Sequence, residues 1–291
     1  MIDIKCSDNR KVFNWHEEGI PFVSFDMLDK IGVPNLYTTR YSSLDCNTGM
    51  IEKGLRVALM KSEDVTEARQ VIVANLGRLA EELGSDVAHI GVTNQLHTTN
   101  VVALEADGLG YWNCIEHNRP EVGIDGLITD VPNACLVVYG ADCPPIYLVD
   151  AQHHAIGLVH AGWKGTLGCI PKVAIKMMEE KYGSKPSEMY AAIGPSICEN
   201  CYEMGDEIFD MFSEQWSLED AKILMKRHES GKYHLDLWTA NRLTLERAGI
   251  PADHIAVTNI CTCCNTDTFY SYRAHAMENE QAAMLVNSGV K

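Results

Sequence analysis

The feature that most constrains the fold is a series of short apolar runs between residues 126 and 160, too closely spaced to leave room for helices. Their length and their β-branched side chains are typical of buried strands. The runs are 126–129, 134–139, 146–149 and 156–160. Neighbouring parallel strands need long crossovers, usually helical, so this order argues against a doubly wound parallel sheet. We therefore predict an α+β architecture, with helices packed outside mixed β-sheets.

Periodicity predicts the remaining elements, and no repeat or linker divides the chain. Further strands are expected at 21–25, 35–39, 87–92, 100–103, 189–193, 232–235 and 255–258, and helices at 64–83, 167–182, 206–212, 237–248 and 275–286. Because 46% of the 291 residues are hydrophobic, the chain can bury a sizeable core. We expect one domain over residues 1–291.

Soft metal ligands stand at the ends of three of the predicted strands. Cys143 follows one run, His160 ends another, and His97 follows residues 87–92. Pro144 and Pro145 remove two backbone donors, so the thiol of Cys143 is expected at a strand edge. Two histidines and one cysteine form a known catalytic zinc set, which leaves a fourth position for water or substrate.

Each of these residues also has a structural interpretation, because single cysteines and histidines are often buried core groups. Cys143 and His160 alone are equally compatible with a thiolate nucleophile and its base. His97 favours zinc, since a Cys–His pair has no need of a second imidazole.

An anion site is predicted immediately after His160. Gly162 and Gly165 allow close backbone approach, Lys164 adds charge, and a helix is expected to begin there. A tight strand-to-helix turn is the equal alternative. Arg40 is a second anion candidate.

The motifs in these segments resemble the YfiH-like family, described both as multicopper polyphenol oxidoreductase laccases and as purine nucleoside phosphorylases. The resemblance spans roughly residues 36–273 and continues weakly into 261–262 and 269–273. It rests on Gln95-Leu96-His97, Ala141-Asp142-Cys143-Pro144-Pro145, His160-Ala161-Gly162-Trp163-Lys164-Gly165, Ala192-Ile193-Gly194-Pro195-Ser196-Ile197 and Tyr202-Glu203-Met204-Gly205.

The resemblance implies one zinc per chain, bound by His97, Cys143 and His160. It implies phosphorolysis of adenosine, inosine, guanosine or methylthioadenosine to free base and ribose 1-phosphate, with adenosine deamination as a second activity. A sandwich-like core related to the cytotoxic necrotizing factor catalytic fold is also implied. Substrate and phosphate would contact a set of five residues: Arg40, Gln95, Gly162, Lys164 and Arg273. Copper is disfavoured because the other histidines form no clustered ligand sets.

This chain departs from the family pattern at three places. Lys164 stands where the family more often has arginine, and the loops after Arg40 and Arg273 differ in sequence. Substrate inferences from those loops are weaker than those from the metal ligands.

Deamination needs a nucleophilic water and a proton donor for ammonia. Zinc lowers the pKa of bound water to about 7, and an acidic residue near the metal is the usual proton shuttle. Asp142 adjoins Cys143, but neighbouring strand residues point to opposite faces. A structural role for this carboxylate is at least as well supported as a catalytic one.

Two other functional classes stay open. One is a cysteine hydrolase such as an amidase or deamidase, with Cys143 as nucleophile and His160 as base. Editing of peptidoglycan precursors is a further activity that the resemblance to the YfiH-like family implies. The other is a non-catalytic regulator with a structural metal.

The net charge of −16, from 24 basic and 40 acidic residues, disfavours nucleic-acid binding and requires any anion site to be a local exception. No signal peptide or membrane-spanning run is recognised, so we expect a cytoplasmic enzyme, a monomer or small homo-oligomer, whose partners are purine nucleosides and phosphate.

Five of the eleven cysteines form two clusters late in the chain, namely Cys198, Cys201, Cys261, Cys263 and Cys264. Together they could supply four thiolates to a second zinc, although the later cluster reads Cys-x-Cys-Cys. Small buried thiols are the alternative.

Overall fold

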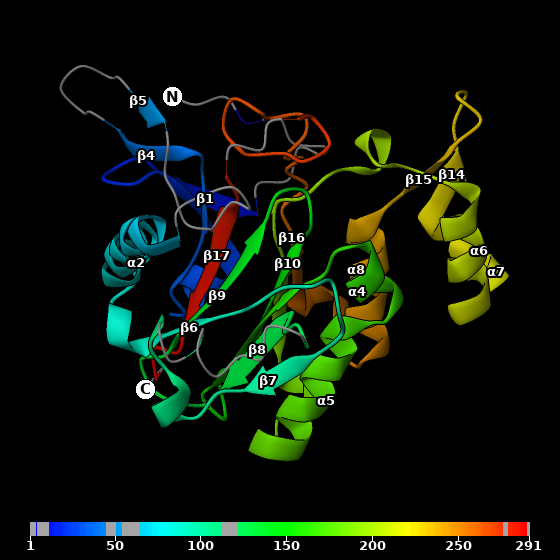
Figure 1. Cartoon of the computed structure of the whole chain (residues 1–291). Coiled ribbons are helices and arrows are strands. Elements are labelled where there is room, and N and C mark those ends of the chain that lie inside the picture. Colours follow the sequence, from blue (N-terminus) through cyan, green and yellow to red (C-terminus); the bar gives the residue numbers. More distant parts are fainter. Residues whose placement is uncertain are drawn as a thin grey trace.

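Two six-stranded sheets form the centre of the protein (Figure 1). The computed structural model describes residue 4 and residues 12–44, 51–53, 65–111, 114, 122–275 and 279–289. In the first sheet the strands are β1 (Phe13–His16), β2 (Phe22–Phe25), β3 (Asn35–Thr38), β17 (Gln281–Val286), β9 (Cys135–Gly140) and β6 (Ile90–Val92), in that order. The second has the order β16 (Ile255–Val257), β12 (Tyr190–Ile193), β10 (Pro145–Asp150), β11 (Ala155–His160), β8 (Gly126–Thr129) and β7 (Val101–Ala103).

Both sheets are mixed. Most neighbours are antiparallel, but β6 pairs with β9, β12 with β16, and β7 with β8 in parallel. The prediction of an α+β fold with mixed sheets is confirmed. The relation to the necrotizing factor fold and the single domain stay predictions.

The two sheets pack against each other through alternate side chains. Along β10, Tyr147 and Val149 join the cluster shared with the first sheet, whereas Ile146 and Leu148 join the cluster formed with helices. This alternation follows from the two-residue period of a strand.

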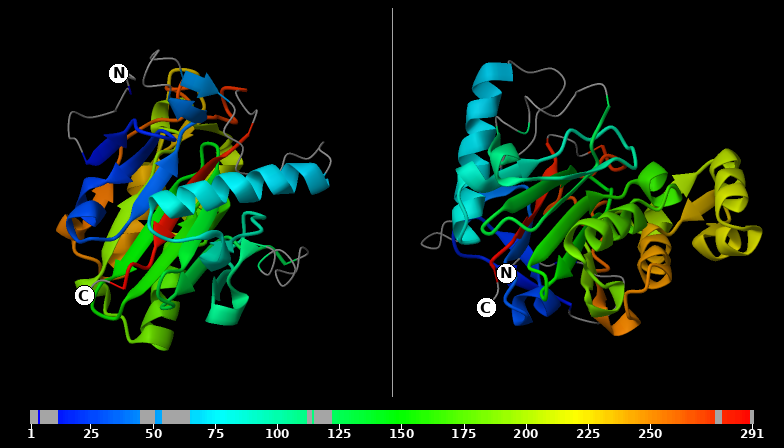
Figure 2. Two further views of the ribbon diagram at one scale, coloured as in Figure 1. Left: turned by 90° about the vertical axis from the view of Figure 1, so that its left-hand side faces the viewer. Right: turned by 90° about the horizontal axis from the view of Figure 1, so that it is seen from below.

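Helices cover the outer faces of the two sheets (Figures 1 and 2). On the first sheet lies α2 (Val65–Glu82), whose Ile72, Leu76 and Leu79 are fully buried. The second sheet is covered by α4 (Trp163–Leu167), α5 (Ile170–Tyr182) and α8 (Leu237–Arg247). Shorter elements are α1 (Asp26–Lys30), α6 (Asp206–Gln215), α7 (Leu218–Leu224), the hairpin of β4 (Tyr41–Leu44) and β5 (Ile51–Lys53), and a small sheet of β13 (Glu203–Met204), β15 (Tyr233–Leu235) and β14 (Met225–Arg227).

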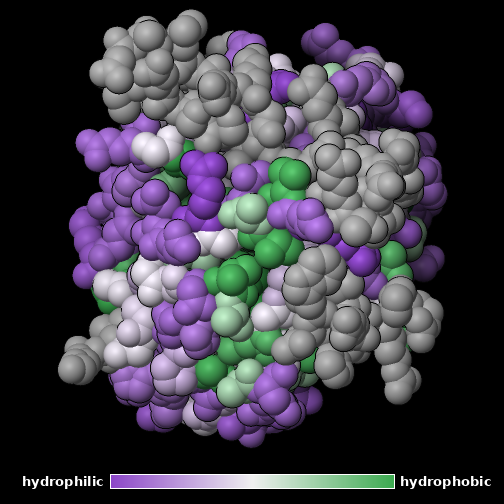
Figure 3. Space-filling view, turned by 60° about the vertical axis from the view of Figure 1, so that its left-hand side comes forward, coloured by the Kyte–Doolittle hydropathy of each residue, from purple (hydrophilic) through white to green (hydrophobic). Residues whose placement is uncertain are grey.

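Figure 3 shows a face on which a narrow strip of hydrophobic side chains is bordered on its left by hydrophilic ones. Among the described residues, no helix is long and apolar enough to cross a bilayer.

Two predicted helices are wrong in part or in whole. The predicted helix at 275–286 contains β17, which lies in the middle of the first sheet between β3 and β9. Its Ala-Ala-Met-Leu core favours a helix intrinsically, but pairing on both edges and complete burial override that preference. The predicted helix at 167–182 is interrupted by Cys169, whose left-handed φ of 55° separates α4 from α5.

A third correction concerns residues 87–92. Only β6 is a strand, because Asp86 caps a short 3₁₀ turn over Val87–His89. The loop at 45–50 after Arg40 lies outside the described residues.

Candidate metal centre

His97, Cys143 and His160 meet at one end of the sandwich. His97 lies beyond β6, Cys143 lies on the connection that leaves β9 in one sheet and enters β10 in the other, and His160 is the last residue of β11. Their donor atoms all lie within 4.8 Å of one another. The Cys143 Sγ is 4.0 Å from His97 Nε2, and the ring centroids of His97 and His160 are 4.9 Å apart. The predicted trio is therefore brought together in space.

Asp125 fixes both histidines, and sequence analysis missed it. The carboxylate is fully buried just before β8 and accepts a hydrogen bond from His160 Nδ1 at 2.8 Å. It also accepts the backbone N–H groups of Leu96, His97 and Thr98, at 3.2, 3.0 and 2.7 Å. Hydrogen bonding of Nδ1 leaves Nε2 of His160 directed to the cluster, which is the usual arrangement behind a metal-binding histidine.

The backbone at this centre is strained. His97 has a φ of 59° and Asp142 a φ of 91°, conformations that non-glycine residues rarely adopt. Such residues cost about 1 to 3 kcal/mol each and concentrate at functional sites. The hydrogen bond from the His97 N–H to Asp125 holds one of these conformations in place.

Gly162 borders the ligands directly. A Cβ at this position would lie 2.8 Å from Cys143 Sγ and 3.1 Å from His97 Cδ2. Glycine is therefore needed so that the chain after β11 can pass behind the ligand atoms.

The thiol and imidazole at this centre perturb each other. Burial disfavours a thiolate, but the nearby His160 and hydrogen bonds from both histidines outweigh it and lower the pKa of Cys143 to about 7. Burial likewise opposes a charged His160, while Cys143 and Asp125 raise its pKa to about 10. The pair is set to carry a thiolate near neutral pH, the form in which cysteine binds metals.

The donor set fits a tetrahedral metal. Ligand atoms around zinc are separated by roughly 3.3 to 3.8 Å, given zinc–nitrogen and zinc–sulfur bonds of about 2.0 to 2.3 Å. The observed spacing is within about 1 Å of that arrangement. Three protein ligands of this kind leave one coordination position open.

All three ligands line a cavity of about 690 Å³, a size typical of small-molecule sites. Aromatic side chains supply much of its wall. They are Tyr111, Tyr139, Trp163, Tyr202 and Tyr272. The opening of a metal centre into such a cavity favours a catalytic over a purely structural metal.

Asp142 lines the cavity, but its carboxylate is engaged by the protein. One oxygen accepts the Thr262 hydroxyl at 2.6 Å and the other the Arg273 N–H at 2.7 Å. These bonds tie the Cys143 loop to residues 262–273. This arrangement favours the structural interpretation of Asp142.

Gln95 and Arg273 also line the cavity. The Gln95 amide is paired with both backbone groups of Tyr139, at 2.7 and 2.8 Å. The Arg273 guanidinium donates to the carbonyls of Cys201 and Glu203, at 3.3 and 2.9 Å.

Arg40 and Lys164 are not among the cavity-lining residues. Arg40 is buried elsewhere, donating to the Thr266 carbonyl at 2.7 Å and lying over the Tyr270 ring. Lys164 is exposed on α4, with its ammonium 5.6 Å from the Trp163 ring centroid. The helix that follows His160, α4, has only five residues and ends at Leu167. The long helix, α5, begins at Ile170 and so does not start beside the metal ligands.

Glu280 is a second residue that sequence analysis missed. It precedes β17, lines the cavity, and lies close enough to His97 and His160 to feel their charge. Burial raises its pKa above the usual range for a carboxyl group. A partly buried carboxyl group beside a metal centre is suited to proton transfer.

The fold and the site together define a class of protein with a Cys/His metal centre opening into a small-molecule cavity. Residues 51–287 match the family model of the multi-copper polyphenol oxidoreductase laccases, so the chain belongs to this family, the YfiH-like proteins.

Curated relatives in the family carry enzyme names. A purine nucleoside phosphorylase of Bacteroides thetaiotaomicron is 33% identical over 215 residues, covering 73% of this chain and 76% of that protein. The adenosine deaminase RL5, from an unknown prokaryotic organism, is 35% identical over 208 residues, covering 71% and 78%.

The fold also matches solved structures. The crystal structure of YlmD from Geobacillus stearothermophilus is 28% identical, with a TM-score of 0.80 over 95% of this chain and 99% of that one. Bacillus licheniformis YfiH is 25% identical, with a TM-score of 0.77 over 94% and 98%.

Proposed function

We propose that this protein is a zinc-dependent purine nucleoside phosphorylase with adenosine deaminase activity, acting on adenosine, inosine, guanosine and methylthioadenosine. One observation carries the proposal: His97, Cys143 and His160 converge at the wall of a cavity of about 690 Å³. The names of its relatives, which include both activities, support it.

The three ligands would hold the zinc, and Asp125 would orient two of them. When bound, the ion would supply a Lewis acid and a water of lowered pKa. A thiolate with two imidazoles suits zinc, whereas multicopper oxidases need additional histidine clusters.

We assign proton transfer in deamination to Glu280 rather than Asp142. Both oxygens of Asp142 already accept hydrogen bonds from Thr262 and Arg273. Glu280 faces the same cavity, and its raised pKa favours the protonated form that can donate to departing ammonia. Replacing Glu280 by Gln should reduce inosine formation by about 10²- to 10⁴-fold while zinc content stays unchanged. Unaltered inosine formation would remove Glu280 from the mechanism.

The purine and the phosphate would use different parts of the wall. Tyr139, Trp163 and Tyr202 offer aromatic surface for a base. Among the described cavity-lining residues, Arg273 carries the permanent positive charge that phosphate requires in a protein of net charge −16. The Arg273 guanidinium therefore provides local positive charge for an anion in a protein that is negatively charged overall.

Product analysis tests the proposal. Zinc-loaded protein is incubated with adenosine, with and without phosphate, and bases and nucleosides are separated. We expect adenine and ribose 1-phosphate only with phosphate, and inosine without it. If neither adenine nor inosine forms, the proposal is wrong.

The cysteine hydrolase has one specific observation in its favour. Cys143, His160 and Asp125 stand in the order of a nucleophile, a base and an orienting carboxylate, with 2.8 Å between the last two. A hydrolase of this kind would keep its amidase turnover after chelation and lose it on alkylation of metal-free Cys143. The phosphorylase would lose turnover on chelation alone.

A further inference from the structure

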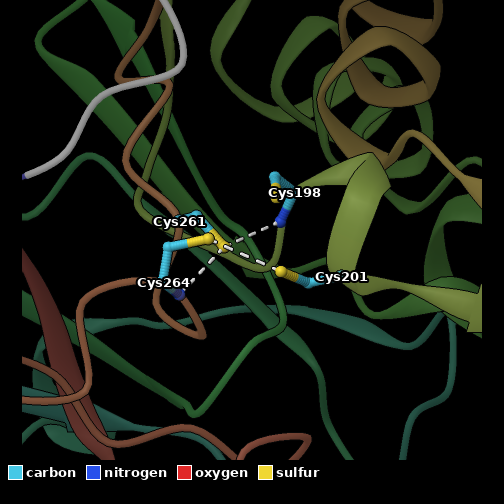
Figure 4. Close-up of side chains that lie close together, drawn as sticks. All are labelled: Cys198, Cys201, Cys261 and Cys264. Atoms are coloured by element: carbon cyan, nitrogen blue, oxygen red, sulfur yellow. Dashed lines mark hydrogen bonds between the residues drawn. The ribbon is translucent and has the colours of Figure 1, made fainter.

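A second group of soft ligands lies beside the cavity, formed by Cys198, Cys201, Cys261 and Cys264. The four Sγ atoms all lie within 4.8 Å of one another. The first two residues come from the 3₁₀ turn Glu199–Cys201 and its N-terminal flank, and the last two from the loop after β16. Figure 4 shows the four side chains gathered between these two segments.

The spacing of these cysteines is that of a zinc-binding pair on each segment. Cys198 and Cys201 are three positions apart, and so are Cys261 and Cys264. Two Cys-x-x-Cys pairs are the usual ligands of a structural tetrathiolate zinc. The second segment has the sequence Cys-x-Cys-Cys because Cys263 stands inside this pair. In the structure, Cys263 is not a member of the group.

The geometry suits a metal better than a disulfide. All four thiols are free, and Cys201 Sγ lies 3.5 Å from Cys264 Sγ. Sulfurs around a tetrahedral zinc are roughly 3.8 Å apart, whereas disulfide sulfurs are about 2.05 Å apart.

The surrounding backbone also stabilises thiolates. The N–H groups of Cys198 and Cys264 donate to Cys261 Sγ at 3.3 and 3.4 Å. Such hydrogen bonds to sulfur are typical of thiolate metal sites. The Arg273 guanidinium, bound to the Cys201 carbonyl at 3.3 Å, adds a positive charge nearby.

We propose that Cys198, Cys201, Cys261 and Cys264 bind a structural zinc that clamps two walls of the cavity together. Tyr202 and Met204 belong to one clamped segment, and Tyr272 and Arg273 follow the other. This raises the expected zinc content from one ion per chain to two.

A short series of hydrogen bonds connects the four-cysteine site to the first metal centre. Thr262, next to the ligand Cys261, donates to Asp142, which adjoins Cys143. Backbone bonds from Thr262 N–H to the Ser196 carbonyl and from Ile197 N–H to the Asp142 carbonyl, at 3.1 and 2.9 Å, join the same segments. The second zinc would therefore position the Cys143 loop without touching substrate.

Metal analysis of protein purified without added zinc tests this site, and it does not depend on the proposed activity. We expect about two zinc ions per chain in the wild type and about one in the Cys201→Ser, Cys264→Ser double variant. His97→Ala should lose the other ion. Cys263→Ser is the matched control and should keep both, because this thiol lies outside the group.

X-ray absorption of the wild type keeps the test decisive if the double variant does not fold. Averaged over one Cys/His₂ site and one Cys₄ site, about 2.5 sulfur ligands per zinc are expected, at about 2.3 Å. About one sulfur per zinc, a wild type that holds only one zinc in total and loses it in His97→Ala, or iron or copper in the Cys₄ site would each overturn the proposal. Equal metal loss in Cys263→Ser and the double variant would also overturn it.

Discussion

Replacing Asp125 by Asn should weaken zinc binding without removing a ligand. The carboxylate accepts five hydrogen bonds, namely those from the N–H groups of Leu96, His97 and Thr98, the Thr98 hydroxyl and His160 Nδ1. An amide offers only one acceptor atom, so its NH₂ group must face donors that the second oxygen now accepts.

The magnitude follows from the number of bonds lost. About two bonds to a buried charge are broken, at roughly 1.5 to 3 kcal/mol each, so metal-free protein should lose about 3 to 6 kcal/mol of unfolding free energy. Zinc affinity should fall about 10- to 100-fold, because the carboxylate no longer orients His160.

Asp150→Asn is a matched control. Asp150 is equally buried, accepts His153 Nδ1 at 2.8 Å and two backbone N–H groups, and ends β10. Asp150 lies about 17 Å along the strand from Pro145, which is two residues after Cys143. This variant should lose stability but keep wild-type zinc affinity.

Zinc competition with a chromophoric chelator and urea unfolding of metal-free protein measure the two quantities separately. Wild-type zinc affinity in Asp125→Asn would refute the orienting role. An equal loss of zinc affinity in Asp150→Asn would show that the effect is general destabilisation.

Three further predictions concern the thiol, an ion pair and the central strand. In metal-free protein, the rate of Cys143 alkylation, measured by peptide mass spectrometry, should rise with pH around a midpoint of about 7, and zinc should block the reaction. A midpoint near 8.5 would show that His160 does not stabilise the Cys143 thiolate. Asp220→Asn should cost about 1 kcal/mol at pH 7. Hydrogen bonds from Arg247 lower the pKa of Asp220 in the folded protein. The ion pair therefore stabilises the fold at pH values above the unfolded-state pKa of about 3.9, and this stabilisation is lost as the pH falls through the folded-state pKa. An equal cost in urea unfolding at pH 7 and pH 2 would contradict it. Leu285→Ala in β17, where the side chain is 0% exposed, should cost about 2 to 5 kcal/mol in urea unfolding, whereas Leu218→Ala, at 54% exposed, should cost less than about 0.5; similar costs would place Leu285 outside the core.

The metal ligands could be predicted because strand ends and ligand chemistry are both visible in a sequence. His97, Cys143 and His160 each stand at or after the end of an apolar run. Asp125 was missed, although a lone acidic residue entering the apolar run at 126–129 could have indicated it. Its importance comes from hydrogen bonds to residues up to 35 positions away, which no local pattern specifies.

Glu280 was missed because its segment was assigned to a helix. The residues of β17 have good intrinsic helix preference, and only the gap between β3 and β9 makes them a strand. Lys164 and Arg40 were predicted from charge near motifs, but side-chain direction depends on packing. The structure turns Lys164 to solvent and buries Arg40 against the Thr266 carbonyl.

The central claim is that one zinc at His97, Cys143 and His160 enables both nucleoside reactions. Its most direct test is to titrate zinc into metal-free protein while following adenine formation with phosphate and inosine formation without it. Both rates should rise from zero in proportion to the zinc bound at this centre and stay at zero in His97→Ala. Full turnover in metal-free protein, or in His97→Ala, would contradict the claim.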